Sequence, residues 1–182
     1  MSNDREIEQI LNWSANEVNE KSFDENFQIK TRDMLQAKLD NYYVEIKESL
    51  LIAVMGELGN NSFDHNSGRW RDVQGVFLKT DNLTRKIIIA DRGCGLKATL
   101  KRVAPEIISD MDAIKIAFTR VVSGRSPENR GNGLKFVSSV VQKKDWQLFF
   151  QSGKAYAEVG INGIEFFDSQ ADIKGCIAIL RF

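Results

Sequence analysis

Apolar positions along the chain follow two different periods, which divide it into helical and strand-forming segments. Between residues 31 and 64 the apolar side chains recur every three or four positions, as they do in a helix that buries one face. This pattern predicts one long helix, or two helices joined end to end. Residues 3–18 show the same spacing in Ile7, Ile10 and Leu11 and predict an N-terminal helix.

The rest of the chain predicts strands with short helices between them. Segments 73–81 and 85–91 are rich in β-branched and aromatic residues, and a polar turn separates them, which is typical of a β-hairpin. The strand at the end of the chain is expected inside the sheet rather than at a fraying edge. Further helices are predicted at 112–122 and 134–144, and further strands at 146–152, 155–161, 164–168 and 176–182.

This order of elements predicts an α+β fold, with helices packed on one face of a largely antiparallel sheet. The chain has 182 residues, of which 42% are hydrophobic, enough for a packed core. We expect residues 1–30 to form an N-terminal helical extension and residues 31–182 to form the main domain. Glycine and small polar residues in the segment 123–133 predict a flexible loop.

Charge and cysteine content narrow the function classes. Lys plus Arg and Asp plus Glu both number 25, so the net charge is zero, which argues against a general binder of nucleic acid or anionic membrane. No apolar run approaches the ~18 residues of a membrane-spanning helix, and the charged start does not resemble a signal peptide. Cys94 and Cys176 are too few for a disulfide scaffold. We therefore expect a cytoplasmic protein.

A polar cluster ends the second helical segment, in the stretch GELGNNSFDHN. Glu57 and Asn61 are four positions apart and share a helical face, and Asp64 follows three positions later. A carboxylate and an amide oxygen on one face suit a hard cation such as Mg2+, and the carboxylate could act as a general base. A solvated helix end would contain the same residue types, so this motif alone leaves both interpretations open.

Two glycine-containing turns follow this cluster. The run IIIADRGCG ends a buried strand at Asp91, and Gly93 and Gly95 permit a tight turn and close approach to a flat ligand. In ENRGNGLKFV, Gly131 and Gly133 precede an apolar helix, whose first N–H groups could bind an anion. Ordinary turns use the same residues, and neither a Walker P-loop nor a dinucleotide-binding fingerprint occurs.

Taken in order, the three motifs resemble the GHKL ATPase superfamily, which includes type II topoisomerases, heat-shock chaperone ATPases, histidine kinases and MutL-like repair proteins. ELGNNSFDH is similar to the N box of that family, DRGCG to its first glycine box and RGNGL to the end of its second glycine box. The resemblance spans residues 47–182. It implies a Bergerat fold, an α/β sandwich with a mixed, mostly antiparallel sheet and a flexible lid over ATP.

The resemblance also implies a role for each matching residue. Asn61 would coordinate Mg2+, and Glu57 would activate water or hold the hydrated metal. Asp91 would accept a hydrogen bond from the adenine amino group, and Asp64 would serve either the adenine or the end of the helix. The other nucleotide-binding residues would be Gly93, Gly95, Arg130, Gly131, Asn132, Gly133 and Leu134. The sequence SGRSPENR departs from the fuller glycine pattern of the lid, which makes its phosphate contacts the least defined part of the site.

Several functions fit an Mg-ATP-binding protein of this type. A self-contained histidine autokinase is disfavoured, because His65 is the chain's only histidine and lies inside the N box. Hydrolysis of ATP in a signalling or regulatory role stays open, as does γ-phosphate transfer to a partner protein in the manner of an anti-sigma-factor-like serine kinase. A non-catalytic nucleotide-sensing module is the alternative. The N-terminal helices could pack on the domain or form a homodimer, and no nucleic-acid or membrane partner is expected.

Overall fold

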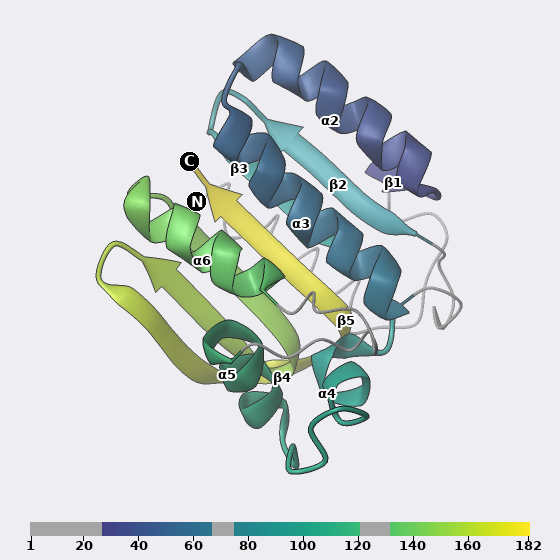
Figure 1. Ribbon diagram of the computed structural model, residues 1–182, viewed down its shortest axis with the longest axis vertical. Coiled ribbons are helices and arrows are strands. Elements are labelled where there is room, and N and C mark those ends of the chain that lie inside the picture. Colours follow the sequence, from purple (N-terminus) through teal and green to yellow (C-terminus); the bar gives the residue numbers. More distant parts are fainter. Residues whose placement is uncertain (1–26, 67–74, 121–131) are drawn as a thin grey trace.

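A single antiparallel sheet forms one layer of the structure, and helices cover one of its faces (Figure 1). The computed structural model describes residues 27–66, 75–120 and 132–182. The strand order across the sheet is β1-β2-β3-β5-β4, and every described pairing is antiparallel. The strands are β1 Gln28–Ile29, β2 Val76–Asp81, β3 Lys86–Ala90, β4 Gln147–Gly160 and β5 Gly163–Arg181.

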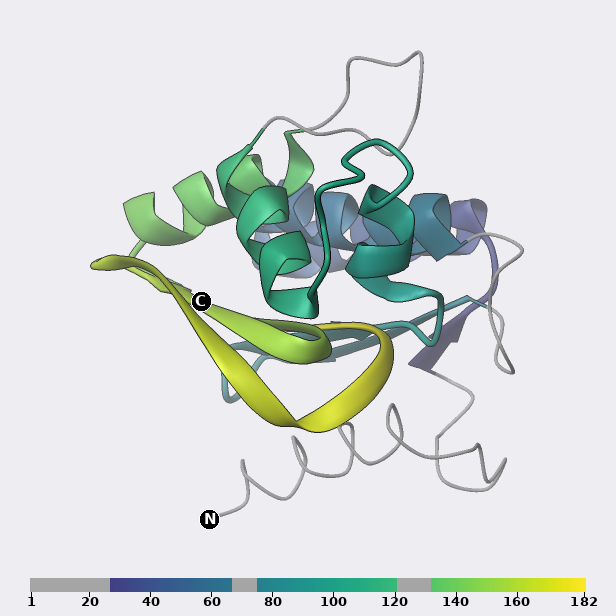
Figure 2. The ribbon, with the colours of Figure 1, turned by 90° about the horizontal axis from the view of Figure 1, so that it is seen from below.

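The helices of the described residues all lie on the same side of this sheet, as Figure 2 shows. The predicted α+β class, with helices packed on one face of an antiparallel sheet, is therefore confirmed. Figure 1 shows α3 between α2 and α6, with α4 and α5 gathered toward one end of the sheet. The helices are α2 Arg32–Ile46, α3 Ser49–Asn66, α4 Gly95–Leu100, α5 Asp110–Thr119 and α6 Gly133–Lys143.

Two predicted segments lie outside the described residues. These are the N-terminal helix, which falls within residues 1–26, and most of the expected flexible loop, which falls within residues 121–131. Gln28 and Ile29, at the end of the expected N-terminal extension, pair with β2 as strand β1. Because Ile29 is completely buried in the main core, the sheet begins before residue 31.

Of the two alternatives for residues 31–64, one long helix is wrong and two helices are found, α2 and α3, joined through residues 47 and 48. The two helices run antiparallel, which the sequence did not predict. Thr31 caps α2 by accepting a hydrogen bond from the Met34 N–H, and Lys47 ends it in the left-handed conformation, with φ of 56°. A β-carbon built on Gly59, late in α3, would lie 2.8 Å from Leu35 Cδ2, early in α2. Both helices have the same apolar spacing, and only two residues separate them. The pattern therefore did not indicate that the chain reverses its direction between them.

The predicted hairpin is confirmed, whereas the number of later strands is wrong. In the hairpin, Asp81 pairs with Lys86 and accepts a hydrogen bond from Thr84 Oγ1 at 2.7 Å across the turn. The segment after residue 145, for which four strands were predicted, forms two long strands, β4 and β5, which pair along most of their length. Strand β5 lies between β3 and β4, which confirms that the final strand is interior. Register shifts near Gly153 interrupt the apolar pattern within β4.

Both faces of the sheet are buried at β3, which explains the uninterrupted apolar run in that strand. Ile87 and Ile89 belong to the main core beneath the helices, whereas Ile88 belongs to a second cluster. This division follows the two-residue period of a strand, which sends alternate side chains to opposite faces. The second cluster consists of Phe77, Ile88, Ala90, Ile173, Ile177 and Ile179.

None of the helices in the described part of the chain has the length and hydropathy of a membrane-spanning segment.

The main core can be tested with one substitution at two positions. Leu148 is 2% exposed and Leu83 is 98% exposed. Leu148→Ala should lower the free energy of unfolding by about 2–5 kcal/mol, because it leaves a cavity among packed side chains. Leu83→Ala removes the same atoms from a turn and should change it by about 0.5 kcal/mol or less. Urea unfolding followed by circular dichroism measures both values, and equal effects would contradict the burial of Leu148.

Candidate functional site

The polar end of α3 faces the first residue of α6. A β-carbon built on Gly133 would lie 2.8 Å from Glu57 Oε2 and 3.1 Å from Asn61 Nδ2, so a larger residue at position 133 would displace one or both side chains. Glu57 is exposed and Asn61 is half-buried, which leaves both side chains accessible to a ligand. The structure therefore brings the two N-box-like residues together with the second glycine motif.

A neighbouring part of the α3 surface is occupied by Arg32, at the start of α2. Its Nη1 donates to Asn60 Oδ1 at 2.9 Å, and its Nη2 forms an ion pair with Asp64. The guanidinium also lies over the ring of Phe63, 5.6 Å from the ring centroid. Asp64 is thus placed at a contact between two helices, which fits the helix-end role that the sequence left open for it.

The first turn of α6 presents backbone N–H groups beside Glu57 and Asn61. Asn132 is the N-cap residue; it is exposed and its side chain makes no capping hydrogen bond. The first N–H groups of a helix lack partners within the helix, and the helix dipole favours an anion there. Leu134, by contrast, is 8% exposed and belongs to the main core, so its side chain anchors the helix.

Asp91 lies buried where β3 ends, with 1% of its surface exposed. Its backbone N–H donates to the Cys176 carbonyl at 2.9 Å, which extends the pairing of β3 with β5 by one residue. Its Oδ1 accepts a hydrogen bond from the Gly93 N–H at 2.9 Å. The chain then enters α4 at Gly95, whose φ of 72° favours glycine. The tight turn that the sequence predicts after Asp91 is therefore present.

Ser152 and Gly175 support this turn from the two long strands. Ser152 Oγ accepts from the Leu96 N–H at 2.9 Å and donates to the Gly175 carbonyl at 3.1 Å. Any side chain at position 175 would clash with the backbone and the carboxylate of Asp91, so glycine is required there. One hydroxyl thus connects β4 and β5 to the start of α4.

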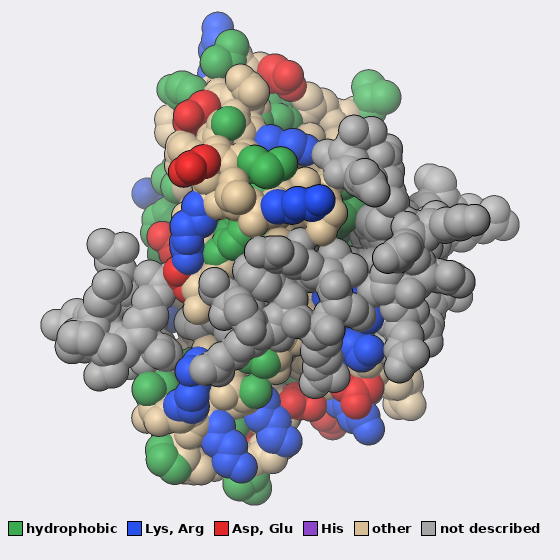
Figure 3. Space-filling view, turned by 90° about the vertical axis from the view of Figure 1, so that its right-hand side faces the viewer, with side chains coloured by type: hydrophobic (Ala, Val, Ile, Leu, Met, Phe, Trp, Pro, Cys, Tyr) green, Lys and Arg blue, Asp and Glu red, His purple; other side chains and the backbone are tan. Residues whose placement is uncertain are grey.

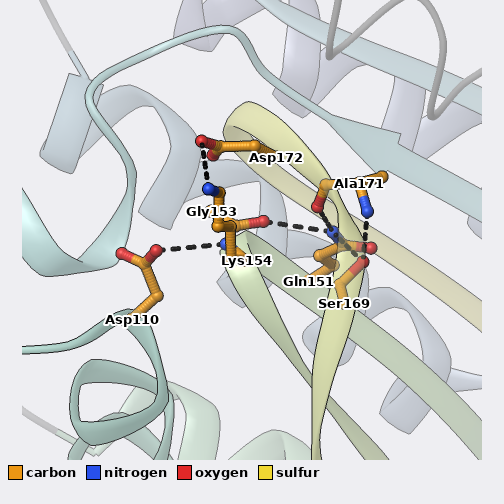
Figure 4. Close-up of polar contacts among 7 residues, drawn as sticks. All are labelled: Asp110, Gln151, Gly153, Lys154, Ser169, Ala171 and Asp172. Atoms are coloured by element: carbon orange, nitrogen blue, oxygen red, sulfur yellow. Dashed lines mark hydrogen bonds and ion pairs between the residues drawn. The ribbon is translucent and has the colours of Figure 1, made fainter.

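Strand β4 bends directly after Ser152, and Figure 4 shows the neighbouring residues Gln151, Gly153 and Lys154. The register of β4 with β5 shifts on both sides of Gly153, as in a β-bulge. Asp110, the first residue of α5, faces the bend and accepts a hydrogen bond from the Lys154 N–H at 3.1 Å. On the other side of the bend, Gln151 Nε2 lies 3.1, 2.9 and 2.9 Å from the Gly153 carbonyl, Ser169 Oγ and the Ala171 carbonyl.

Buried polar groups concentrate around the turn. Arg92, which follows Asp91, is completely buried. Burial, together with the nearby charge of Asp91, raises the pKa of the Cys176 thiol well above its usual value, although a hydrogen bond with Ser152 opposes this effect. Cys176 is therefore a neutral thiol at physiological pH. Cys94 is half-buried, and its Sγ lies 3.3 Å from Thr99 Oγ1.

The three motif segments share one core. Helix α3 contacts β3, α4 and α6, and Leu58, Leu96 and Leu134 all belong to the main cluster. Among the described residues, no group of three or more His, Cys, Asp and Glu side chains is placed to hold a metal. Mg2+ needs no such group where phosphates and waters complete its shell, and Glu57 and Asn61 offer a carboxylate and an amide oxygen. Arg130, Gly131 and the side chain of His65 lie outside the described residues.

Sequence patterns did not indicate that Arg32, Ser152 and Gly175 contribute to the candidate site. Their contacts join distant segments: Ser152 and Leu96 are separated by 56 positions, and Arg32 and Asp64 by 32. A serine within an apolar strand and a glycine before another strand are common in any sheet, so neither carried a local signal. The completely buried Arg92 was also overlooked, although it lies inside the first glycine motif.

No protein-family model matches the chain, and no curated protein sequence matches it. A functional interpretation therefore depends on the residues described above and on their geometry.

The raised pKa of Cys176 predicts low reactivity. Cys176 is half-buried. In a Cys94→Ser variant, Cys176 should react with iodoacetamide at least about tenfold more slowly than a free thiol near neutral pH, because the higher pKa leaves little thiolate. Mass spectrometry follows the alkylation over time. The same variant in concentrated urea is the control and should react at the rate of a free thiol, whereas fast alkylation of the folded protein would contradict the raised pKa.

Proposed function

We propose that this protein binds ATP together with Mg2+ in a Bergerat-type fold and transfers or hydrolyses the γ-phosphate in a regulatory role. The observation that carries the proposal is the contact of Gly133 with Glu57 and Asn61. An oxygen-rich face for a hydrated cation and a helix start suited to phosphate adjoin each other there. A solvated helix end would not require a glycine from another helix at this position.

The phosphates would lie at the first turn of α6, with the metal between them and α3. Mg2+ would neutralise part of the phosphate charge when it is bound. Asn61 would contribute its amide oxygen to the metal shell, and Glu57 would hold a metal-bound water. The open N-cap at Asn132 supports this arrangement, because the N–H groups of the first turn are not satisfied by a capping side chain.

The adenine would bind beside Asp91. Its exocyclic amino group is a donor, and the carboxylate of Asp91 is an acceptor that the turn already orients through the Gly93 N–H. A guanine base has a carbonyl oxygen at the corresponding position and would place an acceptor against an acceptor. Asp91 would therefore select adenine over guanine.

Glu57 is the residue suited to chemistry at the γ-phosphate. Its carboxylate is exposed and lies on the side of α3 that faces the start of α6. It would take a proton from a water, or from a serine hydroxyl of a partner protein, while that oxygen attacks phosphorus and the bond to the ADP oxygen breaks. A nucleotide sensor without turnover would use the same binding residues, and measurement of phosphate release distinguishes the two.

The metal ligand is tested by comparing two adjacent asparagines. Asn61→Ala should weaken Mg2+-dependent ATP binding by about tenfold, or ~1.4 kcal/mol, since it removes one oxygen ligand. Asn60→Ala is the matched control, because Asn60 bonds Arg32 instead of facing Gly133. Calorimetric titration with ATP, in the presence and absence of Mg2+, measures the affinities.

Three results of this titration would overturn the proposal. They are no binding of an adenine nucleotide by the wild-type protein, unchanged affinity in Asn61→Ala, and equal losses in both asparagine variants. Phosphate release measured on the same samples then reports whether bound ATP is turned over.

The base-selecting role of Asp91 predicts a change in nucleotide preference. Asp91→Asn should reduce the preference for ATP over GTP by about tenfold, because an amide can donate to the guanine carbonyl while it still accepts from the Gly93 N–H. Competition of ATP and GTP for a fluorescent nucleotide measures the ratio, and thermal unfolding checks that the variant is folded. An unaltered ratio in a folded variant would show that Asp91 does not read the base.

A further inference from the structure

A cavity lies on the outer side of the turn that follows Asp91. It has a volume of about 270 Å3 and lies between α4, the first residue of α5, the bend in β4 and the part of β5 before Gly175. This volume is close to the lower end of small-molecule sites, which begin at about 300 Å3. Lys97, Ala98 and Lys101 line it, whereas Leu96 and Leu100 of the same helix face the core. Gly93 and Gly95 also line the cavity, so it adjoins the proposed nucleotide site at the turn that follows Asp91.

Three lysine side chains line this cavity. Lys97 and Lys101 are one turn apart on α4, and Lys174 approaches from β5. No ion pair in the described part of the chain involves any of these three lysines. Figure 3 shows Lys and Arg side chains gathered toward the end of the molecule at which Figure 1 places α4.

The two carboxylates of the cavity already have partners. Asp110 accepts a hydrogen bond from the Lys154 N–H, and Asp172 Oδ2 lies 3.9 Å from Lys154 Nζ, as Figure 4 shows. Three lysines and two aspartates line the cavity, and Lys154, which contacts both aspartates, lies next to it. In a chain whose total charge is zero, this is a local excess of positive charge.

We propose that this cavity binds a small phosphate-bearing anion and that the occupied site strengthens nucleotide binding. Three separate ammonium groups match a multiply charged oxyanion better than a single carboxylate, since each can meet a different oxygen. The cavity is too small for a complete nucleotide and suits one phosphate group on a small molecule. The anion site stands on its own geometry, whereas its effect on the nucleotide rests on the proposed function.

The expected coupling between the anion site and the nucleotide site follows from the residues that are next to the lysines in the chain. Lys97 follows Leu96, whose N–H is held by Ser152, and Lys174 precedes Gly175, which packs directly against Asp91. An anion that bridges Lys97 and Lys174 would hold α4 against β5 in the arrangement that positions Asp91. Because coupling free energies are reciprocal, bound ATP should strengthen anion binding by the same factor.

The test uses inorganic phosphate as the probe and backbone amide NMR as the readout. In the full chain saturated with Mg2+ and a non-hydrolysable ATP analogue, phosphate should shift the amides of residues 93–101 and 172–175 in a saturable manner. A Lys97→Gln, Lys174→Gln double variant should bind phosphate at least about tenfold more weakly, as expected when two charge-assisted contacts are lost. Lys143→Gln on the exposed end of α6 is the matched control and should bind as the wild type does.

The design separates failure of this inference from failure of the proposed function. The titration is repeated without the analogue, where shifts at the cavity would support the anion site even if no nucleotide binds. Shifts confined to residues near Asn61 and Gly133, or wild-type affinity for phosphate in the folded double variant, would overturn the proposed anion site. Preferential binding to vesicles that contain a phosphoinositide, lost in the double variant, would overturn the small-molecule assignment in favour of a lipid headgroup.

Discussion

The close packing of β5 against the end of β3 is the constraint on which the candidate site depends. Strand pairing continues one residue past β3, so that the Asp91 N–H bonds the Cys176 carbonyl. The Asp91 carboxylate then occupies the space that a side chain at Gly175 would fill. A buried carboxylate needs donors, and the Gly93 N–H is one of them. Glycine at position 175 thus allows a buried carboxylate to lie directly after the apolar strand β3.

The bend in β4 is the second element of this arrangement. The shift in register at Gly153 turns the strand, and the Ser152 hydroxyl reaches both the start of α4 and the β5 backbone. Asp110 secures the bend through the Lys154 N–H. The turn after Asp91 is therefore held from two strands and, through Asp110, from α5. The same elements form the walls of the lysine-lined cavity, which is why an anion bound there would act on the turn.

Helix α3 shows how one polar face can serve two purposes. Asn60 and Asp64 bond Arg32 and fasten the end of α3 to the start of α2. Glu57 and Asn61, on the adjoining part of the face, meet Gly133 at the start of α6. The sequence interpretation treated this cluster as one unit, because helical spacing places all these residues within a narrow arc. Which residues serve the fold and which remain accessible depends on the neighbours that α2 and α6 supply.

The sequence by itself determined the class of the fold, the β2–β3 hairpin, the helical character of residues 32–46, 49–66 and 133–143, and the tight turn after Asp91. These features depend on local spacing, turn residues and the burial of alternating side chains, all of which are visible in a short window. Tertiary structure alone decided the reversal at Lys47, the merging of four predicted strands into β4 and β5, and the contacts of Arg32, Ser152 and Gly175. A two-residue turn between helices and a one-residue bulge in a strand leave the spacing of apolar residues almost unchanged. A contact between residues that are tens of positions apart does not alter the local sequence pattern around either residue.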